Sequence, residues 1–276
     1  MLRFLDDSIR IIGQRHPLSY RIRLLFSYLW IKIQARWGRK EISFLGFVIS
    51  APSINNVITI IREVFIYEDY MVSLDEKTPF IIDCGGNVGV TVLYWKYFYP
   101  NAEVVVFEPS PMNVSYLKKN VSDNTLTGVR IVESAVGSRE GVMKFWENTL
   151  YPGGSTGERE VYESKHMANY REVTVPVVTL DTFITRRVSV LKIDIEGSEG
   201  VVIEHLYSTK KIGSINTIIF EYHYNEKNLK NNLSSIVSIF EKSKFRFSMY
   251  TNDSSVYYSS VPKISHFMIH AKNSEF

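Results

Sequence analysis

Short apolar runs alternate with helix-like stretches along the chain from residue 79 onward. The apolar runs are rich in Val, Ile and Phe, as are strands that are covered on both faces. They predict strands at residues 80–83, 103–108, 129–134, 188–194 and 216–221. The stretches between them predict helices at residues 88–98, 112–120, 198–208 and 229–242. Strands that alternate with helices favour an α/β fold with a mostly parallel, doubly wound sheet.

The rhythm changes in two places. Residues 137–180 contain two strand-like runs, "GVMKFWEN" and "VTVPVVT", on either side of a polar loop at residues 149–171. A loop of this length in a compact domain is either functional or disordered, so we expect either a lid over the substrate or a disordered surface loop. Near the end of the chain, residues 245–250 and 266–270 predict an antiparallel strand pair at the sheet edge.

Residues 18–37 predict a helix, because their large apolar residues recur at helical spacing on one face. These residues are Leu18, Ile22, Leu25, Phe26, Leu29, Ile33 and Trp37. We expect this face either to pack on its own domain or on a second copy of the chain, as a homodimer, or to lie on an anionic membrane surface. The sequence thus predicts an N-terminal helical extension at residues 1–60 and a main domain at residues 61–276.

Charge is unevenly distributed along the chain. The total is +3, but residues 1–40 contain nine basic and two acidic residues and carry +7, which leaves −4 for the rest. The basic residues form no dense patch, so we expect no nucleic-acid partner. The single cysteine, Cys84, excludes an internal disulfide and fits a reducing compartment. Without an apolar run of about 18–20 residues or a signal-peptide pattern, we expect a cytoplasmic protein, either free or peripheral at the membrane.

Asp83 ends the first strand of the main domain, and a glycine-rich turn, "DCGGNVG", begins there. Gly85, Gly86 and Gly89 allow a tight turn that approaches a ligand closely. The spacing departs from the G-x-G-x-x-G of dinucleotide sites, because Gly86 follows Gly85 directly, and no Gly-Lys-Ser/Thr follows to make a P-loop. A carboxylate here repels a pyrophosphate but suits the ammonium and sulfonium groups of S-adenosylmethionine. We therefore expect Asp83 to face the positive end of that cofactor.

The ends of the next two strands carry further candidates for nucleotide binding. Glu108 lies 23 positions after Gly85 and ends the second strand, where an acid binds ribose hydroxyls. Ser134 ends the third strand, where an adenine edge would lie; a plain strand end without a ligand is the alternative. Ligands of open α/β sheets bind beyond the carboxyl ends of the strands, so these positions predict one adenosyl-binding site.

The stretch "LKIDIEGSEG" places Asp194 and Glu196 directly after an apolar strand. Two like charges this close are costly unless they meet a proton, a cation or hydrogen-bond donors. One of them fits a general base for a substrate hydroxyl, or both fit a divalent ion such as Mg²⁺. We interpret Glu199 as an acid in the first turn of the next helix, and Lys192 as a structural ion-pair partner.

The fifth strand ends in "FEYH", which places Glu221 and His223 on one side of the extended chain. His223 fits a base near neutral pH, a metal ligand or a structural histidine. Asp194, Glu196, Glu221 and His223 are therefore the candidate catalytic residues. The residues alone do not assign a set of metal ligands.

Taken in order along the chain, these motifs resemble the FkbM-type methyltransferases. They are "IIDCGGNVG", "VFEPSP", "ESAVG", "TLDTF" and "LKIDIEGSEG", and the resemblance covers about residues 63–225. It implies the class I S-adenosylmethionine-dependent fold, a Rossmann-like seven-stranded sheet that ends in a reversed hairpin. It also implies O-methyl transfer to a sugar hydroxyl of a glycan, a glycolipid or a natural product.

The resemblance implies a role for several positions. The residues that would cradle the methionine part of the cofactor are Asp83, Gly85, Asn87 and Gly89. Glu108 would hold the ribose. Asp194 and Glu196 would line the reaction centre, where Asp194 would also contact the cofactor.

Two further functions stay open from the residues. One is an NAD-dependent oxidoreductase, which the glycine spacing disfavours. The other is a non-catalytic scaffold that binds an adenosyl cofactor and docks through its basic front.

Overall fold

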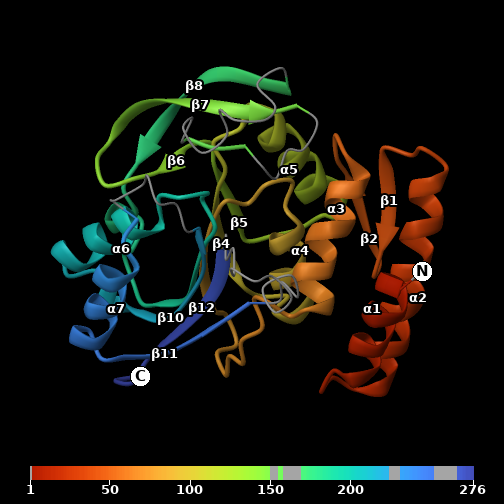
Figure 1. The fold of residues 1–276 in the computed structure, drawn as a ribbon, viewed down its shortest axis with the longest axis horizontal. Coiled ribbons are helices and arrows are strands. Elements are labelled where there is room, and N and C mark those ends of the chain that lie inside the picture. Colours follow the sequence, from red (N-terminus) through yellow and green to blue (C-terminus); the bar gives the residue numbers. More distant parts are fainter. Residues whose placement is uncertain (1, 150–154, 158–168, 224–230, 252–265) are drawn as a thin grey trace, which may run out of the picture.

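The structure is a computed structural model, and it describes residues 2–149, 155–157, 169–223, 231–251 and 266–276. Its centre is a seven-stranded sheet in the order β11-β12-β10-β9-β3-β4-β5 (Figure 1). The strands are β3 (Phe80–Cys84), β4 (Glu103–Phe107), β5 (Val129–Val132), β9 (Val188–Ile193), β10 (Ile215–His223), β11 (Phe245–Tyr250) and β12 (His266–Asn273). Neighbours from β5 to β10 are parallel, and β12 runs antiparallel to β10 and β11. This arrangement confirms the doubly wound sheet with its antiparallel C-terminal strand pair.

Helices cover both faces of this sheet, which explains why its inner strands consist mostly of apolar residues. On one face lie α4 (Val90–Phe98) and α5 (Pro111–Asp123), and on the other lie α6 (Glu199–Ser208) and α7 (Leu233–Lys242) (Figure 1). Successive strand residues point to opposite faces. Ile81 therefore belongs to the hydrophobic core beneath α4, and Ile82 belongs to the core beneath α6.

The strand register brings the carboxyl ends of four parallel strands to one edge of the sheet. Cys84 lies opposite Phe107 of β4 and Ile193 of β9. Ile193 in turn lies opposite Phe220 of β10. The glycine turn and the candidate acids follow these four residues directly in the chain, so the fold places them at the same edge.

The N-terminal segment packs onto the sheet domain and shares a hydrophobic core with it. Its elements are α1 (Leu2–Gly13), α2 (Leu18–Arg36), the hairpin of β1 (Glu41–Phe44) and β2 (Phe47–Ser50), α3 (Ile54–Ile61), and a π-helix (Arg62–Ile66) that continues α3. Tyr28 and Arg62 both hydrogen-bond the buried carboxylate of Asp7, which ties α1, α2 and the π-helix together. The hairpin and α1 were not expected. The boundary between residues 1–60 and 61–276 stays a prediction.

The predicted helix α2 is confirmed, but its apolar face points away from the protein. Five residues of that face are each at least 42% exposed: Leu18, Ile22, Phe26, Ile33 and Trp37. The helix packs on the core through another face, whose buried residues are Tyr20, Leu24, Tyr28, Ile31 and Gln34. The helix therefore packs on its own domain, as one of the alternatives expected, but mainly through a face other than the predicted stripe. Across the described residues, no helix has both the length and the apolar character that spanning a bilayer requires.

A three-stranded sheet in the order β6-β8-β7 occupies the segment that interrupts the strand–helix rhythm. Its strands are β6 (Ala135–Val136), β7 (Gly141–Asn148) and β8 (Tyr170–Val178), seen at the top of Figure 1. The two strands predicted around the polar loop are thus confirmed. Most of the loop at residues 149–171, with its expected lid, lies outside the described residues. Thr156, which is described, bridges to Trp146 of β7.

Candidate active site

The turn between β3 and α4 approaches the end of β9 closely. Gly85 has a φ of +85°, and a Cβ atom there would lie 1.8 Å from the carbonyl oxygen of Asp194. There is no room for a Cβ atom at this position, so only glycine fits there. Asn87 also has a positive φ, and its side chain accepts a hydrogen bond from the N–H of Val88. Gly89, with a φ of +95°, precedes the first residue of α4. The contacts of this turn with a cofactor stay a prediction.

The position of Asp83 corrects the expectation that its carboxylate is open to a cofactor. The side chain is fully buried. Its Oδ2 accepts hydrogen bonds from the hydroxyl of Thr91 at 2.5 Å and from the indole N–H of Trp95 at 3.3 Å. Its Oδ1 lies 3.2 Å from Nζ of Lys192. Because α4 begins directly after the turn, it covers the carboxylate, and Asp83 fixes α4 and Lys192 beneath the turn.

Glu108 joins the glycine turn to the start of α5. Its buried carboxylate accepts hydrogen bonds from the N–H of Asn87 at 2.7 Å and the N–H of Ser110 at 2.9 Å. Burial raises the pKa of Glu108 to about 7, although these hydrogen bonds lower it. Ser134 is buried between β5 and β6. The contacts of Glu108 with ribose and of Ser134 with adenine stay predictions.

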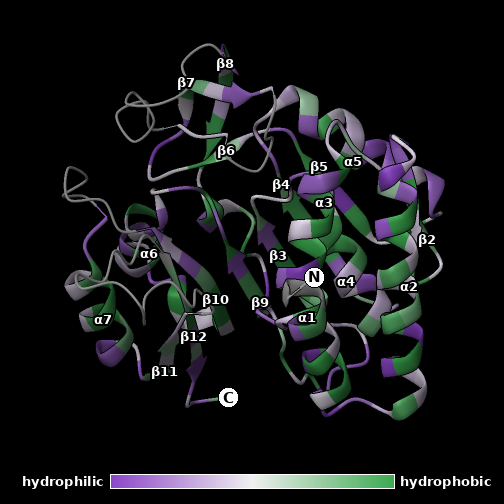
Figure 2. Ribbon diagram, turned by 45° about the vertical axis from the view of Figure 1, so that its right-hand side comes forward, coloured by the Kyte–Doolittle hydropathy of each residue, from purple (hydrophilic) through white to green (hydrophobic). Residues whose placement is uncertain are grey.

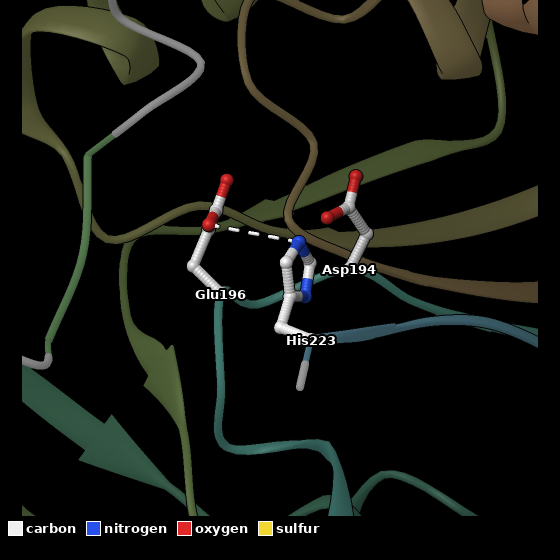
Figure 3. Close-up of side chains that lie close together, drawn as sticks. All are labelled: Asp194, Glu196 and His223. Carbon is white, nitrogen blue, oxygen red and sulfur yellow. Dashed lines mark ion pairs between the residues drawn. The ribbon is translucent and has the colours of Figure 1, made fainter. Parts of the chain in front are cut away.

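The four candidate catalytic residues meet at the ends of β9 and β10. Asp194, Glu196 and His223 point toward one another (Figure 3), and one ligand atom from each lies within 4.8 Å of the others. Nε2 of His223 is 3.6 Å from Oε2 of Glu196 and 3.9 Å from Oε1 of Glu221. All four side chains are partly exposed, so a ligand has access to them. The structure brings these residues together, and their roles stay predictions.

Glu199, predicted from the sequence to be an acid in the first turn of a helix, is buried and holds His223. Glu199 is 0% exposed, and its Oε1 lies 2.9 Å from Nδ1 of His223. Oε1 also accepts the N–H of Gly197, and Oε2 accepts a hydrogen bond from Nδ2 of Asn231. Glu199 does begin α6, as expected. Asn231 was missed, because it lies 32 positions away in sequence and no local motif marks it.

The charges of this cluster change one another's protonation. Burial lowers the pKa of His223, but the charges of Glu199 and Glu196 outweigh burial and raise it well above its usual value. Burial, followed by the charge of Asp194, raises the pKa of Glu221 well above its usual range. Each carboxylate makes it harder to ionise the next, so the cluster favours an added positive charge.

A buried lysine separates this cluster from Asp83. Nζ of Lys192 lies 3.2 Å from Asp83 and 3.6 Å from Asp194, and it donates a 2.7 Å hydrogen bond to the carbonyl oxygen of Gly85. Burial alone lowers the pKa of Lys192, but the two aspartates raise it above its usual value. The hydroxyl of Tyr70 donates to Asp194 at 3.4 Å. Lys192 is confirmed as an ion-pair partner; Tyr70 carried no signal in the sequence.

The site thus combines a tight glycine turn with a carboxylate-rich region one strand away. Lys192 neutralises Asp83, so the negative charge lies at the ends of β9 and β10 rather than at the turn itself. Carboxylates in such a place accept a proton from a hydroxyl group or attract a cation.

The strand order, with the reversed β12 beside β10 and a glycine turn at the carboxyl end of β3, defines the class I methyltransferase fold. The sequence model of the methyltransferase FkbM domain matches residues 83–247, more than half of the chain. The chain belongs to this FkbM methyltransferase family, as its motifs indicated. The family favours methyl transfer over the alternative of an NAD-dependent oxidoreductase.

Curated relatives are methyltransferases by name. Methyltransferase 1 of Beauveria bassiana (strain ARSEF 2860) is 30% identical over 162 residues, which cover 52% of this chain and 65% of that protein. Methyltransferase sdnD of Sordaria araneosa is 29% identical over 168 residues, which cover 51% of this chain and 65% of that protein. The matches thus span less than two thirds of each relative. Among solved structures, methyltransferase FkbM from Methylobacillus flagellatus KT aligns with a TM-score of 0.48 and 13% identity, over 79% of this chain and 52% of that one.

Proposed function

We propose that the protein transfers the methyl group of S-adenosylmethionine to a hydroxyl oxygen of a sugar, in a glycan, a glycolipid or a natural product. The observation that carries the proposal is the group of carboxylates at the ends of β9 and β10, directly beside the glycine turn. Their negative charge suits a sulfonium donor, and a carboxylate suits a hydroxyl that must lose its proton. The sugar as acceptor is supported by the resemblance of the motifs to the FkbM type.

The order of the strands supports one orientation for the cofactor. The turn residues Gly85, Asn87 and Gly89 follow β3, and they are proposed to bind the methionine part close to the end of β9. Glu108, after β4, is proposed to bind the ribose, and Ser134, after β5, to bind the adenine. Asp83 is proposed to support the turn without touching the cofactor, because its carboxylate contacts α4 and Lys192 beneath the turn.

The proposed reaction is a direct displacement. S-adenosylmethionine supplies an activated methyl group, so the protein mainly positions the reactants and removes a proton. The hydroxyl oxygen forms a bond to the methyl carbon while the carbon–sulfur bond breaks, and the bonding pair stays on sulfur. The hydroxyl proton passes to Asp194, which is partly exposed and directly beside the turn. Tyr70 and Lys192 hold this carboxylate in place.

An Asp194→Asn variant is expected to lose at least about 100-fold in methyl transfer, because it removes a general base, while its affinity for S-adenosylhomocysteine changes little. Transfer is measured with a radiolabelled methyl donor on a panel of glycans and lipid-linked sugars, and affinity by calorimetry. Asp181→Asn is the matched control, since Asp181 pairs with His205 outside the cluster. Near-normal turnover of Asp194→Asn removes Asp194 from catalysis, and folded wild-type protein that binds neither cofactor overturns the proposed function.

A further inference from the structure

We propose that Asp194, Glu196 and His223 form a binding site for one divalent transition-metal ion. The proposal deepens the proposed function, on which only the catalytic use of the ion rests. Each of the three residues offers one ligand atom, and these atoms lie within 4.8 Å of one another (Figure 3). Two ligand atoms that are each about 2.0–2.2 Å from one ion lie at most about 4.4 Å apart, so only a small adjustment closes the set.

The orientation of His223 is fixed by a buried network behind it. Its Nδ1 lies 2.9 Å from the carboxylate of Glu199, which is fully buried and also accepts hydrogen bonds from Gly197 and Asn231. A carboxylate that binds one ring nitrogen of a histidine fixes the tautomer in which the other nitrogen is a ligand. This arrangement leaves Nε2 of His223 directed at the cluster.

The surroundings of Nε2 favour a positive charge. Nε2 of His223 lies 3.6 Å from a carboxylate oxygen of Glu196 and 3.9 Å from one of Glu221. Two carboxylates around one ring nitrogen favour a positive charge between them, and a bound ion in place of a proton on Nε2 would supply it. Both distances exceed the usual 2.7–3.2 Å of an N–H···O hydrogen bond, and they are typical of ligands that share an ion. Lys192 does not supply this positive charge between His223 and the carboxylates, because its Nζ lies closer to Asp83 than to Asp194.

The ligand types point to a particular class of ion. An imidazole with two carboxylates suits a transition ion such as Zn²⁺, and the carboxylates also suit Mn²⁺, whereas Mg²⁺ prefers oxygen ligands alone. The ligand set therefore favours a transition ion over Mg²⁺, the divalent ion that the sequence left open. Bound there, the ion would lower the pKa of a coordinated hydroxyl group.

The test measures ion binding on full-length protein without a methyl donor. In a Mn²⁺ titration followed by electron paramagnetic resonance, wild-type protein is expected to bind one Mn²⁺ per chain, and a tenfold excess of Mg²⁺ is expected not to displace it. His223→Gln is expected to weaken binding at least tenfold. Glu199→Gln, which changes only the residue behind the ligand, is expected to weaken it about 10- to 100-fold. His205→Gln is the matched control, because His205 also pairs with a carboxylate.

Several results would overturn the metal site. They are the absence of Mn²⁺ and Zn²⁺ binding to wild-type protein, equal binding by His223→Gln and His205→Gln, and displacement by Mg²⁺. Methyl transfer that persists after chelator treatment, with no ion bound, overturns the catalytic use of the ion and leaves the proposed function standing. Unfolding curves of each variant separate a lost ligand from a lost fold.

A separate observation concerns the outer face of α1 and α2, which we propose docks on an anionic lipid bilayer. Among the described residues, nine of the fourteen exposed large hydrophobic side chains lie between Leu5 and Trp37. Six of them are on or next to α2: Leu18, Ile22, Phe26, Trp30, Ile33 and Trp37. In Figure 2, hydrophobic residues (green) recur along α1 and along α2, the helix at the right-hand edge of the view. Apolar patches of this kind mark interaction surfaces.

The charge of the same segment selects the partner. Residues 1–40 carry +7, and basic residues such as Arg23, Arg36 and Arg39 are exposed along α2 and just after it. Two copies packed through this face would bring two such charges together, whereas an anionic bilayer neutralises them. Tryptophans at the edge of an apolar face are also typical of membrane interfaces. A bilayer therefore fits this face better than a second copy of the chain.

Vesicle flotation tests the docking face. Full-length protein is expected to float with phosphatidylcholine vesicles that contain 30% phosphatidylglycerol at least tenfold more than with phosphatidylcholine alone. The combined substitutions Ile22→Ser, Phe26→Ser and Ile33→Ser are expected to abolish flotation. The control replaces Val142, Tyr207 and Met249 with serine, which are also exposed but lie elsewhere. The bilayer is overturned as the partner if the wild-type protein does not float. It is also overturned if light scattering shows a wild-type dimer and the variant Ile22→Ser, Phe26→Ser, Ile33→Ser is a monomer.

Discussion

A Lys192→Met variant is expected to lower the free energy of unfolding by about 3–5 kcal/mol, because it leaves a buried carboxylate without its counter-charge. Lys192 and Asp83 are both fully buried, and their Nζ and Oδ1 atoms lie 3.2 Å apart. The variant also removes the hydrogen bond to the carbonyl oxygen of Gly85. Urea unfolding followed by far-ultraviolet circular dichroism measures the change.

Two controls distinguish the cost of leaving a buried charge unpaired from the cost of replacing any lysine. Lys118→Met removes an exposed partner of Glu133, and it is expected to cost less than about 1 kcal/mol. Asp83→Asn, added to Lys192→Met, removes the unpaired charge and is expected to restore part of the stability. If Lys192→Met costs no more than Lys118→Met, the ion pair of Lys192 with Asp83 does not stabilise the fold, and the role described for the two residues is wrong.

The central sheet was predictable because its strands are buried on both faces. All six residues of β9 are buried, and four of them, Val188, Val190, Leu191 and Ile193, are apolar, as expected of a short strand that is covered on both faces. The same reasoning placed the candidate acids, since the residue that follows each parallel strand lies at one edge of the sheet. Sequence reasoning therefore gathered Asp194, Glu196, Glu221 and His223 correctly into one place.

The direction of a side chain at that edge was not predictable. Asp83 follows the strand pattern that predicted it, but whether its carboxylate meets a ligand depends on where α4 begins and on what Lys192 contacts. Glu199 and Asn231 raise the same difficulty, because their contact joins segments far apart in sequence. Such side-chain contacts form only after the fold has brought the two partners together, so no local sequence pattern indicates them.

The N-terminal segment shows two limits of pattern reasoning. The hairpin of β1 and β2 turns at Leu45 and Gly46, which both have positive φ. Such turns usually contain Asn-Gly or Asp-Gly, so the leucine concealed the turn. In α2, apolar residues lie on both faces, and periodicity does not say which face packs on the protein. The buried face is stabilised by Tyr28, whose hydroxyl donates a hydrogen bond to Asp7 on α1. No sequence pattern indicates this contact.

A Gly85→Ala variant is expected to lose at least about 100-fold in affinity for S-adenosylhomocysteine, and to be less stable by at least about 2 kcal/mol. The new Cβ would lie 1.8 Å from the carbonyl oxygen of Asp194, so backbone must move. A positive φ costs a non-glycine residue a further 1–2 kcal/mol or so. The N–H of Asp194 also donates a hydrogen bond to the carbonyl oxygen of Cys84. The turn therefore cannot move away from Asp194 without separating β3 from β9.

The loss of affinity follows from the size of that movement. A shift of about 1 Å in a positioned group is enough to cost about 100-fold in reaction rate. We expect a comparable loss of affinity, because relief of the clash needs a shift at least this large in the turn or in Asp194. Gly213→Ala is the matched control, because nothing lies within 4 Å of a Cβ atom at that position. Calorimetry and urea unfolding on both variants measure the two effects. Normal affinity in Gly85→Ala would show that the cofactor binds away from this turn, and the proposed orientation along β3, β4 and β5 would then fail.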